Sequence, residues 1–438
     1  MLLPKNIRLK DKNTDAVLKQ LLNIKDSNIF FSKHALTKEK VKGRMANVCT
    51  GILTYTPKQC ACCGFDSVIH HSYKECWIQF IPFQEVPTYL HLFKQRFFCK
   101  QCGHTFSAKT YCVAENCSLS RALKFAIAID LKKKISMKDI AQRYFVSVKT
   151  VERVLDSFFK EPKFNPSYLP KNLSIDEFKG TNDCEGAMCF ILSDALTGKI
   201  FDILDDRRNF KLMAYFLRFT QKARQNVQHI VMDMNAGYHQ VTQKLFPNAQ
   251  VSIDRFHVVQ QLTRAFNKQR IQVMTNLKKS DPTAMKDQRK LKKYWRTLLK
   301  KNKKINFTSF KQFPLFKQKY VTESEVLDHL LAIDTSLKES YEVYQELLAS
   351  FEAKDSLRFF TQMEQLPTTL DHSFKKAILY LTKHKQAISN ALTYPYSNGK
   401  LEGKNNLIKV MKRMAFGFRT FRHLRRRILI QQNLCKII

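Results

Sequence analysis

Two Cys-x-x-Cys pairs constrain the N-terminal part of this 438-residue chain more than any other feature. Cys60 and Cys63 lie in CACCGF, and Cys99 and Cys102 lie in FFCKQCGHTF, each pair closing with a glycine. A gap of two residues lets both thiolates of one turn reach the same ion, and the glycine permits the tight backbone. The pattern therefore predicts a structural Zn²⁺ held by four thiolates, rather than four free buried cysteines.

The 35 residues between the two pairs are too many for the loop of a compact zinc ribbon. The last part of this spacer, CWIQFIPFQEVPTYLHLFKQRFF, is rich in aromatic and β-branched residues and predicts a hairpin or small sheet. Cys62 and His104 are alternative ligands. Twelve cysteines with this spacing indicate metal binding rather than a disulfide framework. We expect a zinc-binding β module over residues 49–112, after an N-terminal helical segment over residues 1–48.

The charge of the chain points to a polyanionic partner. There are 75 Lys and Arg against 37 Asp and Glu, a net charge of +38. Cations that neutralise phosphates release counterions, so this excess favours nucleic acid. A membrane surface is the rival partner, but no apolar run approaches the roughly 18 residues that a spanning helix needs. No signal-peptide core follows MLLPKNIRLK. The expected location is the cytosol, without membrane binding.

Residues 118–160 have the pattern of helices. SLSRALKFAIAIDLKKK carries apolar residues at helical spacing, and SMKDIAQRYFVSVKTVERVLDSFF contains two short helices around a turn at YFVS. Two helices joined in this way are typical of a helix-turn-helix, whose second helix enters the major groove of DNA. The residues near the start and on the polar side of that helix, where DNA contacts are expected, are Ser147, Lys149, Thr150 and Arg153. An ordinary helical hairpin is the alternative.

The remaining chain has the pattern of an interrupted α/β domain. EPKFNPSYLP carries three prolines, so residues 161–172 are a linker. Residues 173–257 predict the order β-β-β-α-β-α-β, which indicates a mixed sheet. Residues 258–390 are helical by pattern and nearly free of glycine, and we interpret them as a helical insertion. Residues 391–438 then complete the α/β domain with a helix that carries Glu402.

Three carboxylates are the candidate catalytic residues. Asp176 and Asp233 end predicted strands, and strands of one sheet deliver such residues to a common edge. Glu402 is the only acid among residues 372–438, whereas ten residues from Lys400 to Arg427 are Lys or Arg. Three converging acids repel one another unless divalent cations neutralise them, and Mg²⁺ (or Mn²⁺) prefers such hard oxygen ligands. The isolation of Glu402 therefore indicates a site with two metal ions, surrounded by cations that hold DNA phosphates, among them Lys404, Lys409, Lys412 and Arg413.

A plainer interpretation makes Asp176 and Asp233 strand-end caps and Glu402 a solvated helix residue. Asp254, in the strand pattern AQVSIDRFHVV, competes for a place among the metal ligands. His257 follows it closely and is either structural or placed near the scissile phosphate.

SIDEFKG, VMDMNAGY, FPNAQVSIDRFHVVQ and YSNGKLEGKNNLIKVMKRMAFGFRTFRHLRRRI resemble the signatures of the ISL-three family of insertion-sequence transposases. The resemblance covers the chain from about Cys60 onward. It implies a zinc module, a helix-turn-helix and a ribonuclease H-like catalytic domain of the Asp-Asp-Glu type, interrupted by a helical insertion. It also implies that Asp176, Asp233 and Glu402 form the metal-binding triad. Lys400 departs from the pattern, since relatives often have proline after Asn-Gly.

The sequence thus predicts a multidomain α/β DNA transposase. Such an enzyme binds terminal inverted repeats and target DNA as a homodimer or higher oligomer, because two ends must be held together. A zinc and helix-turn-helix regulator without catalysis, or a nuclease of the same fold, are the alternatives.

Overall fold

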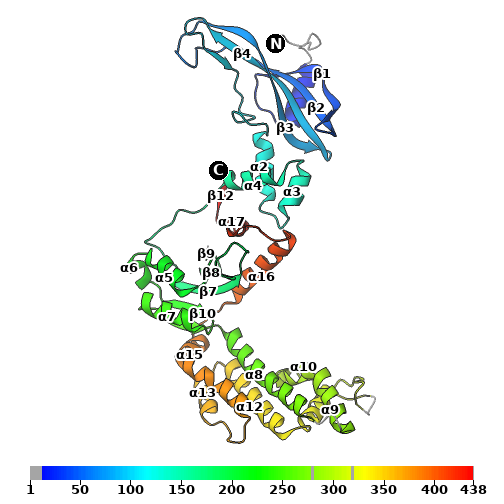
Figure 1. Ribbon diagram of the computed structural model, residues 1–438, viewed down its shortest axis with the longest axis vertical. Coiled ribbons are helices and arrows are strands. Elements are labelled where there is room, and N and C mark those ends of the chain that lie inside the picture. Colours follow the sequence, from blue (N-terminus) through cyan, green and yellow to red (C-terminus); the bar gives the residue numbers. More distant parts are fainter. Residues whose placement is uncertain (1–11, 278–280, 317–319, 438) are drawn as a thin grey trace. The chain divides into compact units, whose positions relative to one another are not determined.

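The computed structural model of the chain describes residues 12–277, 281–316 and 320–437. The chain divides into two compact units (Figure 1). One unit comprises the chain up to Lys163 together with the segment from Ile408 onward, and the other comprises Phe164–Leu407. The chain therefore leaves the first unit once and returns to it near the C-terminus. Within the described ranges, no helix combines the length and apolar character needed to cross a lipid bilayer.

A five-stranded sheet dominates the N-terminal part of the first unit. Helix α1 (Lys12–Leu21) is followed by five strands: β1 (Ile29–Val41), β2 (Arg44–Leu53), β3 (Val68–Phe83), β4 (Val86–Cys99) and β5 (Thr105–Ser107). The strand order is β1-β2-β4-β3, and β5 also pairs with β4. The β2–β4 pair is parallel, and the other pairs are antiparallel. The hairpin predicted between the cysteine pairs is the long β3–β4 ribbon.

The structure differs from the prediction of a helical segment over residues 1–48. Among the described residues of that segment, only α1 is helical, and β1 and the first half of β2 form part of the sheet. The strand pattern of β1 is hidden because it is an edge strand whose residues 37–40, Thr-Lys-Glu-Lys, are exposed. Charged residues on an edge strand discourage pairing with other chains, and they also weaken the hydrophobic alternation.

Three helices follow the sheet, α2 (Arg121–Asp130), α3 (Met137–Arg143) and α4 (Val148–Phe158), as the helical pattern predicts. Ser120, Ser136 and Ser147 cap their N-termini through side-chain hydroxyls. These helices share an apolar core with α17 (Phe421–Gln431), which contributes Leu429 and Ile430. A short antiparallel pairing of β6 (Phe159–Lys160) with β12 (Lys436–Ile437) closes the unit.

The segment 391–438 was expected to complete the α/β domain as a whole. In the structure its residues up to Leu407 belong to the second unit, and its residues from Ile408 onward belong to the first. Arg427 is 3% exposed, and its guanidinium donates to the carbonyls of Leu131, Lys133 and Ile135. Arg425 and Arg426 form ion pairs with Glu161, and Arg426 also pairs with Asp156. These three arginines tie the C-terminal helix to the helices of the first unit, whereas the charge pattern alone assigned the arginines of this tail to DNA phosphates.

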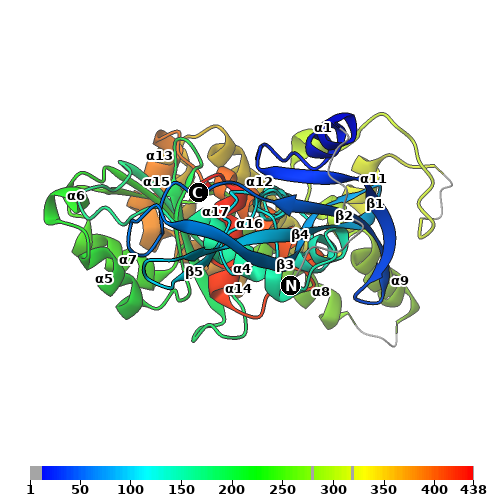
Figure 2. The same cartoon turned by 90° about the horizontal axis from the view of Figure 1, so that it is seen from above.

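The second unit contains a mixed five-stranded sheet in the order β11-β10-β7-β8-β9. Its elements in chain order are β7 (Asn172–Lys179), β8 (Met188–Asp194), β9 (Ile200–Leu204), α5 (Asn209–Leu217), α6 (Gln221–Gln225), β10 (His229–Met232), α7 (Ala236–Leu245) and β11 (Gln250–Ile253). β7, β10 and β11 are parallel, and β8 and β9 continue the sheet antiparallel. Helices α5 and α7 pack against each other (Figure 2). The predicted order is observed, with α6 as an addition.

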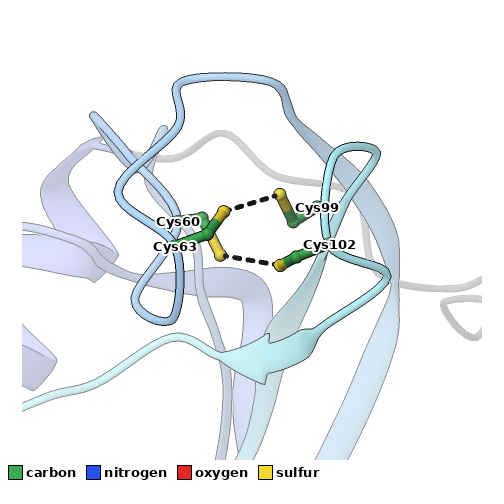
Figure 3. A group of neighbouring side chains, drawn as sticks. All are labelled: Cys60, Cys63, Cys99 and Cys102. Atoms are coloured by element: carbon green, nitrogen blue, oxygen red, sulfur yellow. Dashed lines mark hydrogen bonds between the residues drawn. The ribbon is translucent and has the colours of Figure 1, made fainter.

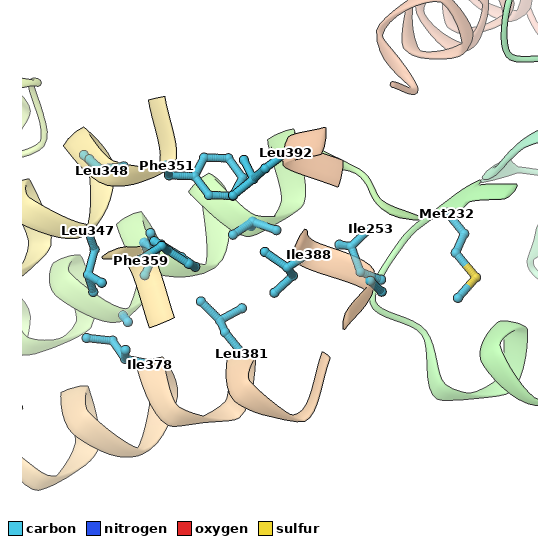
Figure 4. Packing of buried hydrophobic residues seen from close by; sticks show 14 of the residues in the cluster. Met232, Ile253, Leu347, Leu348, Phe351, Phe359, Ile378, Leu381, Ile388 and Leu392 are labelled. Atoms are coloured by element: carbon cyan, nitrogen blue, oxygen red, sulfur yellow. The ribbon is translucent and has the colours of Figure 1, made fainter. Parts of the chain in front are cut away.

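A helical region follows β11. Its helices are α8 (Arg255–Asn276), α9 (Pro282–Lys293), α10 (Trp295–Leu298), α11 (Glu323–Leu331), α12 (Thr335–Glu352), α13 (Ser356–Glu364), α14 (His372–Leu379) and α15 (Lys385–Thr393), with short 3₁₀ turns at Asn302–Lys304 and Tyr380–His384. This region shares one core with the sheet. Figure 4 shows Ile253 of β11 next to Ile388 of α15, and Met232 of β10 belongs to the same apolar cluster. The side-chain amide of Asn390 donates to the carbonyl of Val251 at 2.8 Å, so α15 is fixed to β11.

Candidate functional site

Four cysteine side chains meet beside the end of β4. Cys60 Sγ lies 3.7 Å from Cys102 Sγ, and Cys63 Sγ lies 3.6 Å from Cys99 Sγ (Figure 3). All four sulfur atoms lie within 4.8 Å of one another. A disulfide needs about 2.05 Å, whereas a tetrahedron with Zn–S bonds of about 2.3 Å has edges of about 3.8 Å. The spacing of the thiols therefore fits a four-coordinate zinc ion and not a disulfide.

The two turns that carry these cysteines are tight because of their glycines. Gly64 and Gly103 have φ angles of 76° and 67°, a left-handed conformation that favours glycine. Their N–H groups donate to the carbonyls of Cys60 and Cys99, both at 3.0 Å. Backbone N–H groups of Cys63 and Cys62 lower the pKa of the Cys60 thiol to about 6, whereas burial and the neighbouring thiols raise the pKa of Cys63 and of Cys102. A cation among the four sulfur atoms would therefore favour their thiolate forms. Among the described residues, Cys62 and His104 do not join the cluster.

The carboxylates of the second unit lie along one edge of its sheet. Asp233 directly follows β10, and Asp254 directly follows β11. Asp176 lies inside β7 rather than at its end. In the parallel pairing of β7 with β10, Ser174 is opposite Val231. Asp176 and Asp233 each come two residues after this pair, so they lie at the same level of the sheet. The register also pairs Met232 with Ile253, which brings Asp233 level with Asp254. Parallel strands thus deliver three acids to a single edge.

These acids share an unfavourable electrostatic environment. Burial raises the pKa of Asp176 to about 6, and the negative charge of Asp233 adds to the shift. Burial also raises the pKa of Asp254, with smaller contributions from Asp233 and Glu402. Two acids near each other disfavour ionisation of both, and a cation between them would remove that penalty. Among the described residues, the four cysteines are the group of three or more potential metal ligands whose ligand atoms all lie within 4.8 Å of one another. The carboxylate oxygens of the acids do not meet this distance as a group.

His257, on the first turn of α8, is placed against Asp233. Its Nε2 lies 2.7 Å from Oδ1 of Asp233. The hydrogen bond to Asp233 and the negative charges of Asp233, Asp254 and Asp176 raise the pKa of His257. The imidazole can therefore hold Asp233 in place and offset its charge.

Glu402 lies in the first turn of α16 (Gly399–Met414) and is exposed. The residue before this helix, Asn398, is 2% exposed and holds the helix start against the sheet. Its side-chain amide donates to the Ile175 carbonyl at 3.0 Å, and its Oδ1 accepts from the Ser174 hydroxyl. Its backbone N–H donates to Oδ1 of Asp254 at 3.2 Å, and its carbonyl accepts from the N–H of Glu402 at 2.7 Å. Asp254, the competing ligand candidate, is thus buried and engaged in positioning α16.

A second asparagine on α16 contacts Asp176 directly. Asn405 is 5% exposed, and its Nδ2 donates to Oδ2 of Asp176 at 2.7 Å. The other oxygen of Asp176 accepts from the N–H of Glu177 at 2.7 Å. Asn398 and Asn405 therefore join the helix that carries Glu402 to the strand that carries Asp176. Sequence analysis missed both residues, and the Ser-Asn-Gly turn before Glu402 was the available signal for Asn398.

The predicted DNA-contacting residues have varied surroundings. The Ser147 hydroxyl caps α4 by accepting from the Thr150 N–H at 3.1 Å, and Lys149 pairs with Glu152 at 2.8 Å. Arg153 is exposed on the same helix. On α16, Lys409 and Arg413 are exposed, and Lys404 and Lys412 are half-buried. Their contacts with DNA stay predictions.

Comparison with known proteins gives two family matches. A model described as Transposase, for the ISL3 group of DDE enzymes, matches residues 173–428, more than half of the chain. A second model, described as the zinc-finger of transposase IS204/IS1001/IS1096/IS1165, matches residues 56–102 and includes all four clustered cysteines. The zinc-finger match and the thiol geometry together support a structural zinc ion.

Two curated proteins are similar to parts of the chain. A protein named ATP-dependent protease from Lactococcus lactis subsp. lactis is 36% identical over 117 residues, which cover 26% of this chain and 36% of that protein. The chain thus spans little more than a third of that relative. The transposase for insertion sequence element IS1001 from Bordetella parapertussis is 23% identical over 358 residues, which cover 77% of this chain and 80% of that protein.

Proposed function

The chain belongs to the ISL-three (ISL3) family of transposases, and we propose that it binds the terminal inverted repeats of an insertion sequence and cuts and joins DNA there. The observation that supports the proposal is the arrangement of the elements that carry Asp176, Asp233 and Glu402. The strand register brings the two aspartates to one sheet edge, and Asn398 fixes the helix of Glu402 to the same strands. The mixed order of this sheet supports a ribonuclease H-like catalytic domain.

Divalent cations fit this donor set. Asp176, Asp233 and Glu402 offer carboxylate oxygens, which are the ligands that Mg²⁺ and Mn²⁺ prefer. Burial raises the pKa of Asp176 to about 6, with a smaller contribution from the charge of Asp233, and a bound cation would favour the ionised carboxylate. Two bound cations would supply Lewis acidity, which activates an attacking oxygen and stabilises a leaving oxygen at phosphorus.

The side chains around the acids have distinct tasks in this proposal. Asn405 orients the Asp176 carboxylate, and His257 holds Asp233. Asp254 and Asn398 position the first turn of α16. Water or a 3′-hydroxyl is then directed at the phosphodiester, without a covalent protein–DNA intermediate.

DNA recognition belongs to the first unit in this proposal. Helices α3 and α4 act as a helix-turn-helix, with Ser147, Lys149, Thr150 and Arg153 near the duplex. The zinc finger orders the β-sheet beside them. Lys404, Lys409, Lys412 and Arg413 of α16 bind DNA phosphates in this proposal. Two DNA ends must be joined, so we expect a homodimer or higher oligomer.

The test is strand cleavage by Glu402→Gln, using end-labelled duplex that carries the element's inverted repeats, in Mg²⁺. We expect repeat binding to persist and cleavage to fall by about 10²–10³-fold, the usual effect of removing one group that stabilises transition-state charge. Glu346→Gln makes the same change at an exposed glutamate of α12 and should cleave like the wild type.

Full cleavage by Glu402→Gln would remove this residue from the mechanism. Repeat binding by the wild type without any metal-dependent nicking would instead indicate a regulator. Pre-cut ends with a free 3′-hydroxyl distinguish a nuclease, which forms no strand-transfer product.

A further inference from the structure

A groove of about 490 Å³ lies within the first unit, between the sheet and the two helices α3 and α4. The turn between β1 and β2 and the first residues of β4 form one side of it. The end of α3, the turn after it and the start of α4 form the other side. The groove therefore opens directly beside the N-terminus of α4, the helix proposed to enter the major groove.

The two sides of the groove are fixed to each other. Gln79 of β3 is 5% exposed, and its side-chain amide donates to the carbonyls of Tyr144 and Phe145 at 2.9 and 3.2 Å. The backbone of Gln79 also pairs with the segment before α2, through Ser118 and Ser120. Buried hydrogen bonds of this kind hold the turn between α3 and α4 against the sheet, so both sides can meet one rigid ligand together.

The lining of the groove is basic. Lys42 comes from the β1–β2 turn, Arg44 is the first residue of β2, and Lys138 comes from α3. All three are exposed, none forms a salt bridge with another described residue, and no lining residue is acidic. Lys149 on α4, by contrast, is paired with Glu152. Lys42 and Arg44 lie over the rings of Tyr89 and Phe145, at 6.0 and 5.8 Å from the ring centroids. Three cations that have no acidic partner among the lining residues favour an anionic occupant.

Lys42 also occupies an unfavourable backbone position. Lys42 and Gly43 have φ angles of 50° and 82°. A two-residue hairpin turn of this kind requires positive φ angles at both central residues. Asn, Asp or Gly is preferred at the first of these positions, and a lysine there is uncommon. Lys42 adopts an unfavourable backbone conformation at the tip of a hairpin beside α4. This suggests that its positive charge has a functional role at this position.

We propose that this groove, with Lys42, Arg44 and Lys138, binds the sugar-phosphate backbone of the same duplex whose major groove receives α4. The proposal rests on the proposed function, because it presumes that α4 contacts DNA. It makes the β-sheet a direct part of the DNA-binding surface, in addition to its role as the zinc-bearing support. Duplex DNA is the favoured occupant because its phosphates complement the three cations and its backbone flanks any helix in the major groove.

The test measures duplex binding by fluorescence anisotropy over a range of salt concentrations. Lys42→Asn removes one charge while placing a preferred residue in the turn, and Lys42→Asn with Arg44→Gln removes two. Each lost phosphate contact should weaken binding by about 5- to 10-fold at 0.1 M salt and lower the slope of log K against log salt by about 0.9. Circular dichroism and zinc content should stay at wild-type values.

Lys354→Asn is the matched control. Lys354 is also exposed and has a φ of 59°, but it lies after α12 in the second unit. This variant should keep the affinity and slope of the wild type. Arg153→Ala on α4 separates the two proposals. If it loses binding while the double variant keeps the wild-type affinity and slope, the groove proposal is overturned and the proposed function stands. If the wild type itself fails to bind repeat DNA, the proposed function is overturned.

Discussion

The four clustered cysteines and the three proposed catalytic carboxylates are both sets of side chains whose chemistry suits metal ions, but the chain assembles them in opposite ways. The cysteines come from two turns that a single β-ribbon brings together, and their sulfur atoms already lie within 4.8 Å of one another. The carboxylates come from β7, from the end of β10 and from α16, which are far apart in the sequence. Local turn geometry suffices for the first site, whereas the second depends on strand register and on asparagine side chains that hold a distant helix.

The two sites therefore differ in what supports them. At the cysteine site, glycine turns present the four thiols, and a zinc ion would join the two turns. At the carboxylate site, side-chain hydrogen bonds of Asn398 and Asn405 link the helix of Glu402 to the strand of Asp176. We expect ligand loss to unfold the first site locally, and loss of a supporting amide to impair the second without unfolding.

The largest effect is expected from Cys99→Ser. Structural zinc contributes roughly 10–16 kcal/mol of apparent binding free energy in small zinc-finger peptides, so its loss should abolish zinc binding and expose the adjoining β-strands. Zinc content by mass spectrometry and hydrogen exchange of β3–β5 measure both outcomes. Cys62→Ser is the control, because Cys62 lies between two ligands yet outside the cluster. Equal zinc content in the two variants would contradict the assignment of Cys99.

A smaller effect is expected from Asn405→Ala. Removing a group that orients a metal ligand typically costs 10–100-fold in activity or metal affinity. Repeat cleavage should therefore fall by about that factor, while zinc content and DNA affinity stay unchanged. Asn406→Ala is the control, since Asn406 is the exposed neighbour on the same helix turn. Cleavage at the wild-type rate by Asn405→Ala would show that the contact with Asp176 is incidental.

The same contrast decides how much of the molecule the sequence could predict. The spacing of the cysteines and the glycines beside them sufficed to predict the cysteine cluster. The alternation of apolar and polar residues and the helical periodicity predicted the order of strands and helices in residues 173–253, apart from α6. Edge strand β1 was missed because its exposed lysines mask its pattern. The structural role of Arg425, Arg426 and Arg427 was not predicted. The charge of a residue does not reveal whether its side chain is buried, as in Arg427, or paired with an acid, as in Arg425 and Arg426.

The carboxylate site shows a further limit of the sequence. Asp176 and Asp233 follow from strand patterns, but nothing in the local sequence reveals that Asn405 faces Asp176 or that Asp254 accepts from Asn398. Those contacts depend on a fold that joins residues more than 140 positions apart. Resemblance to a family partly compensates for this, because it implies a role for Glu402 without a structure.

The account depends most on the claim that the distant acids hold divalent cations together, and Mn²⁺ binding followed by electron paramagnetic resonance tests it most directly. At pH 7.5 we expect the wild type to bind Mn²⁺ and Asp176→Asn and Glu402→Gln to bind it at least tenfold more weakly. Since burial raises the pKa of Asp176 to about 6, protonation should weaken binding to the wild type as the pH falls through 6. Wild-type Mn²⁺ affinity in both variants, with no loss between pH 7.5 and 5, would contradict the account.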